Sequence, residues 1–467
     1  MGWTYPRLVI AALRGGAGKT TLSLGMIAAW KKLGRNVAPF KKGPDFIDSA
    51  WLSLAAQKPC RNLDTFLLGP KKVQQSFGRN AEFQGISLIE GNRGLYDGMD
   101  SRGTQSTAEL AKLLKAPVVL VLDCTKVTRT LAAMVLGCQR MDPGVDIRGV
   151  ILNQVARSRH EKILRASIEE TCDLPVLGAV PRMDDFPFPE RHLGLTPPQE
   201  HQWVSQALER AAEVAKKYLD LEELWKIGES ASPFHWEPEE EEKLQAAADR
   251  PRIGILRDSA FQFYYPENLQ ALKDRGACLV EISAVREKAL PPLNALYIGG
   301  GFPETHAEQL ANNLSFRQSM REVIEKGLPV YAECGGLMYL GQSLAMGTRV
   351  YPMAGAIPVA FSMEKRPQGH GYTLLEVEKE NPFYAVGRIL KGHEFHYSRV
   401  LSLEEGRFHF AFRVKRGTGI KEKQDGLCWK NVLATYSHIH ALGCEEWAVG
   451  LMRKAAENRA GYSLAAV

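Results

Sequence analysis

The feature that most constrains this chain is a glycine-rich run near its start, which reads LVIAALRGGAGKTT over residues 8–21. An apolar segment leads into the run and Lys-Thr closes it, which is typical of a phosphate-binding loop between a strand and a helix. Glycines lack a Cβ atom, so Gly15, Gly16 and Gly18 allow backbone N–H groups to surround an oxyanion at the helix N-terminus. The run therefore predicts a nucleotide site.

Each residue that closes this loop has its own expected role. Lys19 would reach the outer phosphates, and the Thr20 hydroxyl would be a ligand of Mg²⁺. The usual first glycine of GxxxxGK[ST] is Leu13 here, so the rest of the loop is close to the deviant loop of partitioning ATPases, with Arg14 where they carry lysine. An ordinary glycine-rich turn is the alternative. The residues predicted to bind ATP are Gly15, Gly16, Gly18, Lys19, Thr20 and Thr21.

Length and charge limit the class of protein. A chain of 467 residues is too long for one core, which suggests two or three domains. The net charge of +6 is mild and no long run of Lys or Arg occurs, so we expect no nucleic-acid partner. Such a charge suits an acidic small-molecule substrate.

Eight scattered cysteines form no CxxC pair and no zinc-type cluster, which predicts a reducing, cytoplasmic location. We expect no signal peptide and no membrane partner, because charged residues come early and no apolar run approaches the ~18–20 residues of a membrane span.

Alternation of strands and helices organises the first half of the chain. This order predicts an α/β fold with a doubly wound parallel sheet. The expected strands are residues 8–12, 36–40, 86–90, 118–122, 148–152 and 176–179, and the expected helices are 20–33, 106–114, 128–139, 159–170 and 198–227. The predicted domains are 1–227 for nucleotide binding, 228–250 as an acidic linker, 251–450 as a second α/β domain and 451–467 as a tail.

Charged side chains follow two of these strands. The segment FKKGPDFID, residues 40–48, contains a Gly-Pro turn at a strand's carboxyl end, where open α/β sheets place ligands. Glu90 ends another strand beside a glycine and is the candidate for a second Mg²⁺ ligand. A solvated loop that contributes only charge is the alternative for residues 40–48.

A second candidate site lies in the other half of the chain, after expected strands at 252–256, 277–282, 295–298 and 328–331. Cys334 follows the last strand and precedes Gly335, as a nucleophile does in an elbow, where a helix N-terminus lowers the pKa of the thiol. A lone cysteine at a strand end is more often a small buried hydrophobe. Here, however, Gly300 and Gly301 after the preceding strand offer N–H donors for an oxyanion hole.

A histidine base for this cysteine is expected from the late segment ATYSHIH, residues 434–440. In a strand, Tyr436, His438 and His440 would share one face. The pattern alone does not choose between the two histidines.

Together these motifs resemble the cobyrinic acid a,c-diamide synthase family, in which an ATP-dependent amidoligase domain of the dethiobiotin-synthetase type is fused to a class I glutamine amidotransferase domain. The likeness covers essentially the whole chain. It runs through GGAGKT, FKKGPDFID, NLD, EGNRGLYDG, GGGFPE, YAECGGLMYL, HEFHYS and ATYSHIH in that order.

The resemblance implies a ligase that amidates the a and c acetates of a tetrapyrrole in cobalamin biosynthesis, with ATP and Mg²⁺. Cys334 would attack the glutamine amide, and His438, in the Tyr-x-His position, would activate it. Ammonia would pass to the first domain and displace phosphate from a phosphorylated carboxylate. The subtype lacks the third-member glutamate of ordinary triad glutaminases, and residue 440 is accordingly histidine.

The resemblance also implies roles for charged residues of the first domain. The expected Mg²⁺ ligands are Thr20, Asp45 and Glu90. The expected substrate and acyl-phosphate residues are Asp45, Asp97, Lys41, Lys42, Arg61 and Arg93. The oligomeric state is left open, with a homodimer among the options.

One departure bears on the substrate. The family usually has Val-Met after the Glu-Gly at this point, whereas this chain has Asn92-Arg93, which looks more like relatives that amidate siroheme or sirohydrochlorin. Two other classes compete with the enzyme. A partitioning-type ATPase switch would explain the loop but not residues 251–450, and a non-catalytic tetrapyrrole-binding protein would not explain the loop.

Overall fold

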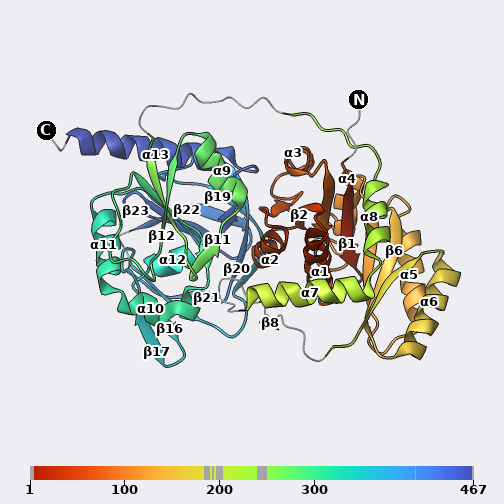
Figure 1. Ribbon diagram of the computed structural model, residues 1–467. Coiled ribbons are helices and arrows are strands. Elements are labelled where there is room, and N and C mark those ends of the chain that lie inside the picture. Colours follow the sequence, from red (N-terminus) through yellow and green to blue (C-terminus); the bar gives the residue numbers. More distant parts are fainter. Residues whose placement is uncertain are drawn as a thin grey trace. The chain divides into compact units, whose positions relative to one another are not determined.

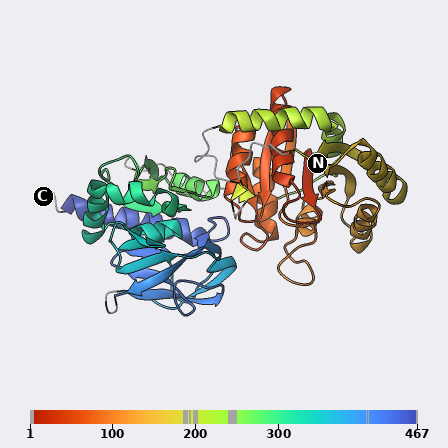
Figure 2. The same cartoon turned by 90° about the horizontal axis from the view of Figure 1, so that it is seen from below.

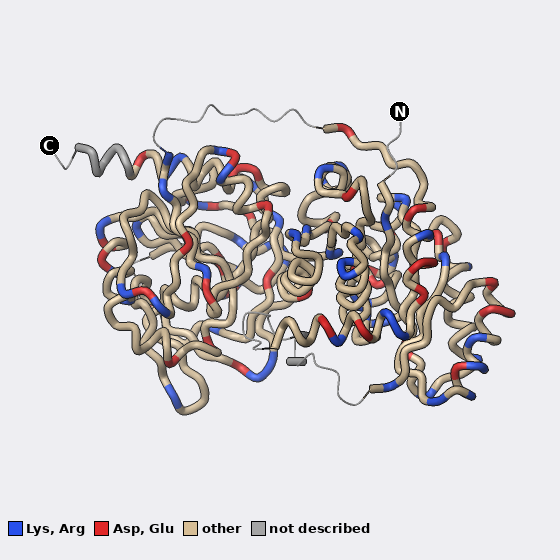
Figure 3. The backbone as a smooth tube through the Cα atoms, viewed as in Figure 1, with Lys and Arg blue, Asp and Glu red and all other residues tan. Residues whose placement is uncertain are grey.

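The structure is a computed structural model, of which residues 5–183, 190–191, 194–195, 203–238, 250–404, 406 and 408–464 are described. The chain divides into two compact units, Met1–Glu240 and Glu241–Val467, each with its own sheet (Figure 1). Among the described residues no helix is both long and apolar enough to cross a membrane. Figure 3 shows Lys and Arg interspersed with Asp and Glu along both units.

A seven-stranded sheet forms the centre of the first unit, in the order β3-β2-β4-β1-β5-β6-β7. Neighbouring strands are all parallel, so the predicted doubly wound parallel sheet is confirmed. The strands are β1 Arg7–Ala12, β2 Asn36–Lys42, β3 Arg61–Leu63, β4 Gly85–Glu90, β5 Val118–Asp123, β6 Ile147–Val155 and β7 Val176–Pro181, and a separate antiparallel pair is formed by β8 Glu190–Arg191 and β9 Gly194–Leu195.

Helices connect these strands. They are α1 Lys19–Lys32, α2 Ile47–Ala56, α3 Pro70–Asn80, α4 Thr107–Leu113, α5 Thr130–Met141, α6 Ser158–Cys172, α7 Val204–Tyr218 and α8 Leu221–Glu229. Helix α1 is buried on nearly all sides from Leu22 to Trp30, because it lies against α7 as well as the sheet (Figures 1 and 2). Packing of this kind explains why the helix after the phosphate loop is apolar all round.

The single helix expected over 198–227 is instead two helices, α7 and α8. The chain leaves helical geometry at Leu219, which bridges to Gly178, and the N–H of Asp220 donates to the Leu177 carbonyl at 2.7 Å. The Asp220 carboxylate then accepts from the N–H of Glu223 at 3.0 Å and caps α8. Contact with the edge strand β7 therefore decides the break. Residues 198–202 of the expected helix lie outside the described residues.

The first unit extends into the segment expected to be a linker from residue 228. Phe234 is buried against Tyr5 and Phe77, and the Arg7 guanidinium lies 5.4 Å from its ring centroid. The indole N–H of Trp236 donates to the Tyr5 hydroxyl at 2.8 Å. Aromatic contacts with the start of the chain thus hold residues 228–238 in this unit, although their composition resembles a connector. Residues 239–249 lie outside the described residues.

The second unit is built on a ten-stranded mixed sheet, in the order β12-β10-β13-β15-β24-β23-β22-β19-β20-β25. Strands β12 to β24 of this order are parallel, and the strands beyond β24 are antiparallel. The strands of this sheet are β10 Arg252–Leu256, β12 Cys278–Ile282, β13 Ala295–Ile298, β15 Val330–Glu333, β19 Gly369–Val377, β20 Ile389–His396, β22 His409–Arg416, β23 Gln424–Trp429, β24 Val432–Thr435 and β25 His438–Ile439.

Smaller elements complete this unit. The remaining strands are β11 Phe261–Phe263, β14 Gly300–Gly301, β16 Ser343–Met346, β17 Arg349–Pro352, β18 Val359–Met363 and β21 Ser398–Leu403, and the helices are α9 Pro266–Asp274, η2 Pro303–His306, α10 Ala307–Asn312, α11 Leu314–Glu325, α12 Gly335–Leu340 and α13 Glu445–Leu464. Helix α13 runs across the expected boundary at 450. Trp447, Leu451 and Ala455 recur at helical spacing and are all buried in the core, so residues beyond 450 continue the domain.

We predict that Phe234→Ala destabilises the first unit by about 3 kcal/mol, because it removes a fully buried aromatic ring. In hydrogen exchange measured by mass spectrometry, peptides of β1 and β4 should exchange about 100-fold faster than in the wild type. Peptides of the second unit should not change. His235→Ala, at an exposed neighbour, is the matched control. Unaltered exchange in Phe234→Ala would show that residues 228–238 do not stabilise this unit.

Candidate functional site

The glycine-rich loop connects β1 to α1 through backbone that favours glycine. Gly16 and Gly18 have φ angles of 71° and 94°, in the left-handed region. A Cβ atom on Gly18 would lie 2.2 Å from the Asn153 amide nitrogen, which donates to the carbonyl of Ala17 at 2.9 Å. Asn153 lies near the carboxyl end of β6 and is itself buried. In the structure its side chain holds the loop.

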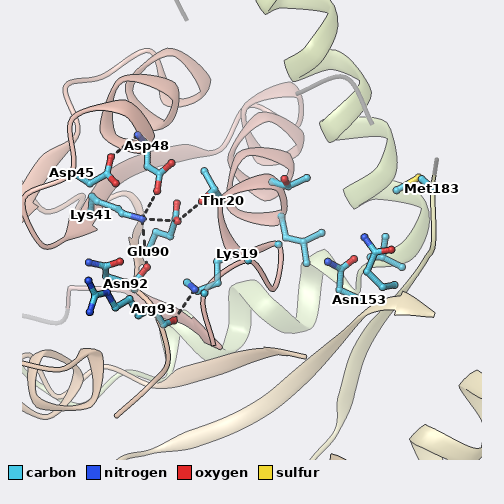
Figure 4. A pocket seen from close by; sticks show the side chains of 18 of the residues that line it. Lys19, Thr20, Lys41, Asp45, Asp48, Glu90, Asn92, Arg93, Asn153 and Met183 are labelled. Atoms are coloured by element: carbon cyan, nitrogen blue, oxygen red, sulfur yellow. Dashed lines mark hydrogen bonds and ion pairs between the residues drawn. The ribbon is translucent and has the colours of Figure 1, made fainter. Parts of the chain in front are cut away.

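A cavity of about 350 Å³ opens over this loop (Figure 4). All six residues predicted to bind ATP line it, together with four of those expected for metal or substrate, Lys41, Asp45, Glu90 and Arg93. The remaining lining residues are Leu22, Asp48, Gly91, Asn92, Asn153, Gln154, Val180, Pro181 and Met183. The carboxyl ends of β1, β2 and β4 meet at this edge of the sheet, which is why residues far apart in the sequence share the cavity.

Lys19 points into the cavity from the first turn of α1. Its ammonium donates to the carbonyl of Arg93 at 2.7 Å and to that of Arg14 at 3.4 Å. Burial lowers the pKa of Lys19 to about 8, against the opposing effect of Glu90. A phosphate group here would offer this ammonium charged oxygens in place of neutral carbonyls.

Lys41 is the centre of a buried charge network beside the loop. Its Nζ atom lies 2.7 Å from Asp48 Oδ2 and 2.8 Å from Glu90 Oε1, and the Thr20 hydroxyl donates to the same Glu90 oxygen at 2.7 Å (Figure 4). Burial alone would lower the pKa of Lys41, but Asp48 and Glu90 outweigh it and raise that pKa above its ordinary value. Lys41 therefore compensates two carboxylates of the cavity itself.

The donor set here suits Mg²⁺. Thr20 and Glu90 present hard oxygen atoms, and Glu90 Oε2 is buried with no hydrogen-bond partner. Across the described residues, no three His, Cys, Asp or Glu side chains are grouped to hold a metal ion. Mg²⁺ in nucleotide enzymes commonly takes one or two protein ligands and completes its shell with phosphate and water, so the arrangement fits. Asp45, the third expected Mg²⁺ ligand, also lines the cavity. Burial, reinforced by the charge of Asp48, raises the pKa of Asp45 to about 7.

Three of the expected substrate residues do not line the cavity. Asp97 Oδ2 accepts from the N–H of Gly94 at 2.8 Å and closes the turn after β4. Lys42 is buried, which lowers its pKa, and Asp64 opposes that effect. Arg61 begins β3. Sequence reasoning also left Asp48 without a role, although it follows Asp45 by three residues and binds Lys41.

The second candidate site lies at the end of β15. Cys334 has φ 48° and ψ −100° between β15 and α12, the strained turn expected of an elbow. Burial, with Glu304 adding to the effect, raises the pKa of the thiol above its ordinary value. The N–H of Gly335, the first residue of the helix, lowers this pKa as expected, but burial outweighs that effect and the net shift is upward.

Gly300 and Gly301 lie beside this turn. A Cβ atom on Gly300 would lie 2.5 Å from His438 Cε1. A Cβ atom on Gly335 would lie 3.0 Å from the nitrogen of Gly301. Side chains at these positions would thus collide with the site. The tertiary structure gathers His438, the two glycines expected as an oxyanion hole, and the Cys334 turn.

The two candidate histidines are in different surroundings. Strand β24 ends at Thr435 and β25 contains only His438 and Ile439, so the expected single strand through residues 436–440 does not form. His438 stacks on His393, with ring centroids 4.9 Å apart, and its Nδ1 lies 3.3 Å from Glu333 Oε2. The Nε2 atom of His440 lies 3.7 Å from Glu267 Oε2. Of the two rings, the one beside Gly300 is that of His438.

Sequence reasoning missed Glu333 and His393 at this site. Glu333 directly precedes Cys334 and His393 begins HEFHYS, so both belong to motifs already noted. Their contacts with His438 join segments separated by 105 and 45 positions respectively, which no local pattern indicates.

Comparison with known proteins matches each half of the chain to a domain family. Residues 8–195 match the CobQ/CobB/MinD/ParA nucleotide binding domain, and residues 252–445 match the CobB/CobQ-like glutamine amidotransferase domain. Proteins named cobyrinate a,c-diamide synthase from Magnetococcus marinus, Archaeoglobus fulgidus and Methanothermobacter thermautotrophicus are 44%, 40% and 40% identical to this chain. The alignments cover 97% of this chain and 98%, 98% and 100% of the respective relatives.

The lowered pKa of Lys19 predicts a pH-dependent affinity for ATP. The ammonium is charged below about pH 8 and neutral above it, so affinity should fall as pH rises through that value. We expect the dissociation constant of Mg²⁺-ATP to increase about tenfold between pH 7 and pH 9 in calorimetric titrations. Lys19→Met should bind weakly with a flat profile. A flat profile in the wild type would contradict the prediction.

Proposed function

The chain belongs to the cobyrinate a,c-diamide synthase family, and from this premise we propose that its two sites carry out a glutamine- and ATP-dependent amidation of tetrapyrrole carboxylates. The observation that carries the proposal is the pairing of a phosphate-loop cavity in one unit with a cysteine elbow beside a histidine in the other. Neither the ATPase-switch interpretation nor the binding-protein interpretation accounts for both.

In the first unit, backbone N–H groups of the loop and the Lys19 ammonium would bind the ATP phosphates. Thr20, Glu90 and Asp45 would hold Mg²⁺, which supplies charge neutralisation on the phosphates when bound. The substrate carboxylate oxygen attacks the γ-phosphorus, ADP leaves and an acyl phosphate forms. Ammonia then attacks the acyl carbon, inorganic phosphate leaves, and an amide remains after loss of a proton.

In the second unit, Cys334 would give its proton to the Nε2 atom of His438 and attack the side-chain carbonyl carbon of glutamine. N–H groups of Gly300 and Gly301 would stabilise the oxyanion that forms. The histidine returns the proton to the leaving nitrogen, so ammonia departs and a thioester remains. Water hydrolyses the thioester to glutamate and restores the thiol. The raised pKa of Cys334 supports the need for a base, because the resting thiol is protonated.

The acceptor we propose is cobyrinate, amidated at its a and c acetates, because the relatives are named cobyrinate a,c-diamide synthases. Arg93 lines the cavity, and its cation is the group we expect to favour a carboxylate of siroheme or sirohydrochlorin over those of cobyrinate. Lys41 is occupied by Asp48 and Glu90, so its contribution to substrate binding would be indirect. All eight cysteines are free thiols, which supports a reducing, cytoplasmic setting.

The central test separates the two half-reactions. Cys334→Ala should abolish glutamine-dependent amidation of cobyrinate and leave the ammonia-dependent rate within about twofold, because the thiol serves only glutamine hydrolysis. Product amide and ADP are measured by liquid chromatography with either nitrogen donor. Cys428→Ala, at another buried thiol, is the matched control and should retain both activities. Retention of glutamine-dependent amidation in Cys334→Ala would overturn the proposed role.

The pair Asn92-Arg93 tests the identity of the substrate. Replacing it by Val-Met removes one charge-assisted contact worth ~1.4 kcal/mol, so the kcat/KM ratio for cobyrinate over sirohydrochlorin or siroheme should rise about tenfold. Arg102→Met, at an exposed position, should leave the ratio unchanged. A constant ratio in the double variant would mean that the pair does not select the substrate. A wild type that prefers siroheme or sirohydrochlorin would overturn cobyrinate as the acceptor.

A further inference from the structure

We propose that Glu333 is the positioning carboxylate of His438, so that Cys334, His438 and Glu333 act as a triad although residue 440 is histidine. This inference rests on the proposed function of Cys334 and His438 in glutamine hydrolysis. The carboxylate would come from the residue directly before the nucleophile, in β15, instead of from the segment that carries the base.

Glu333 is held in one orientation by several donors. Its side chain is buried, and Oε1 accepts from the N–H of Ile439 at 3.1 Å. The other oxygen, Oε2, accepts from the Tyr297 hydroxyl at 3.1 Å and lies 3.3 Å from His438 Nδ1. Both carboxylate oxygens of Glu333 therefore accept a hydrogen bond from another residue. These bonds hold the carboxylate in its orientation against the imidazole ring.

The contact determines which ring nitrogen can accept a proton. An imidazole whose Nδ1 faces a carboxylate carries its hydrogen there, which leaves Nε2 as the acceptor. Nε2 of His438 lies 3.2 Å from the position that a Cβ atom on Gly300 would take, and the adjacent Gly301 lies against Gly335, the residue after Cys334. Glu333 thus directs the basic nitrogen towards the reaction site and stabilises the imidazolium that forms there.

Titratable groups from several elements surround the site of His438. His393, from β20, stacks on it, and burial together with the charge of His438 holds the pKa of His393 well below its ordinary value. Tyr265, from the start of α9, lies 3.2 Å from His393 Nδ1 through its hydroxyl. Glu304 and Glu394 act on the Cys334 thiol, whose pKa they raise in addition to burial. The carboxylate in direct contact with the imidazole is Glu333.

The chain contains its own matched control in the pair formed by His440 and Glu267. Glu267 is also a buried glutamate near a histidine, at 3.7 Å, but that histidine is not the one beside Gly300. Glu333→Gln and Glu267→Gln make the same chemical change at a buried glutamate near a histidine. Loss of folding should affect both variants, whereas loss of positioning should affect only Glu333→Gln.

The test uses the full chain with glutamine or ammonia as nitrogen donor. Glu333→Gln should lower the glutamine-dependent kcat by about 10²- to 10⁴-fold and leave the ammonia-dependent rate within about twofold. Glu267→Gln should stay within about threefold of the wild type with either donor. Cys334→Ala is assayed alongside.

A second readout reports on the base directly. The rate of Cys334 alkylation by iodoacetamide is followed against pH, because it depends on the thiolate that an imidazolium stabilises. In Glu333→Gln the midpoint should move up by about one pH unit or more, since the imidazolium loses its carboxylate. Glu267→Gln, at the carboxylate near His440, leaves the contact between Glu333 and His438 intact and should leave the midpoint in place.

The outcomes distinguish this inference from the proposed function. If Cys334→Ala loses glutamine-dependent activity while Glu333→Gln keeps it, Glu333 has no positioning role and the proposed function stands. If Cys334→Ala keeps that activity, the proposed function itself fails. Equal losses in Glu333→Gln and Glu267→Gln, or an unmoved alkylation midpoint in Glu333→Gln, would also overturn the inference.

Discussion

The ion pair between Lys41 and Glu90 is the interaction on which the nucleotide cavity depends. The two residues are direct partners in the register of β2 and β4, and both are buried. A buried charge left without its partner costs about 3–5 kcal/mol, so neither strand can shift without a large penalty. Because Glu90 also accepts from Thr20, this pair ties the first turn of α1 to the sheet edge. The phosphate loop is therefore positioned by a charge network as well as by its glycines.

Polar contacts at strand ends organise the second unit in a comparable way. Glu333 ends β15 opposite Thr435 of β24, and its carboxylate reaches the backbone of Ile439 and the ring of His438. The strained backbone of Cys334 follows at once. Because Cys334 directly follows Glu333 in the chain and His438 contacts the Glu333 carboxylate, Glu333 links the elbow to the histidine. In both units the strand that leads to the site, β4 or β15, is buried along its length and ends in a glutamate of the site.

Much of the fold could be predicted from local sequence patterns. Strands such as β10 and β13 are short apolar runs that end at turns, and their predicted bounds agree with the structure. The regions whose boundaries were predicted wrongly share one feature, which is contact with distant parts of the chain. Residues 228–238 have the composition of a linker but contribute Phe234 to an aromatic cluster with Tyr5 and Phe77. Helix α13 continues past residue 450 because Leu451 and Ala455 meet a core built from distant strands. Local periodicity does not show which distant residues such a segment contacts.

The sequence by itself determined the parallel α/β architecture, the phosphate loop and the position of Cys334 at an elbow, because each follows from residue types at short spacing. It also identified the family, through the order of several motifs. Only the tertiary structure decided that Lys41 is bound to Asp48 and Glu90, that Asp97 lies outside the cavity lining, and that His438 rather than His440 lies beside Gly300. It also brought Glu333 to His438. These facts depend on which strands are neighbours and on how burial shifts each charge, and neither is encoded in a local run of residues.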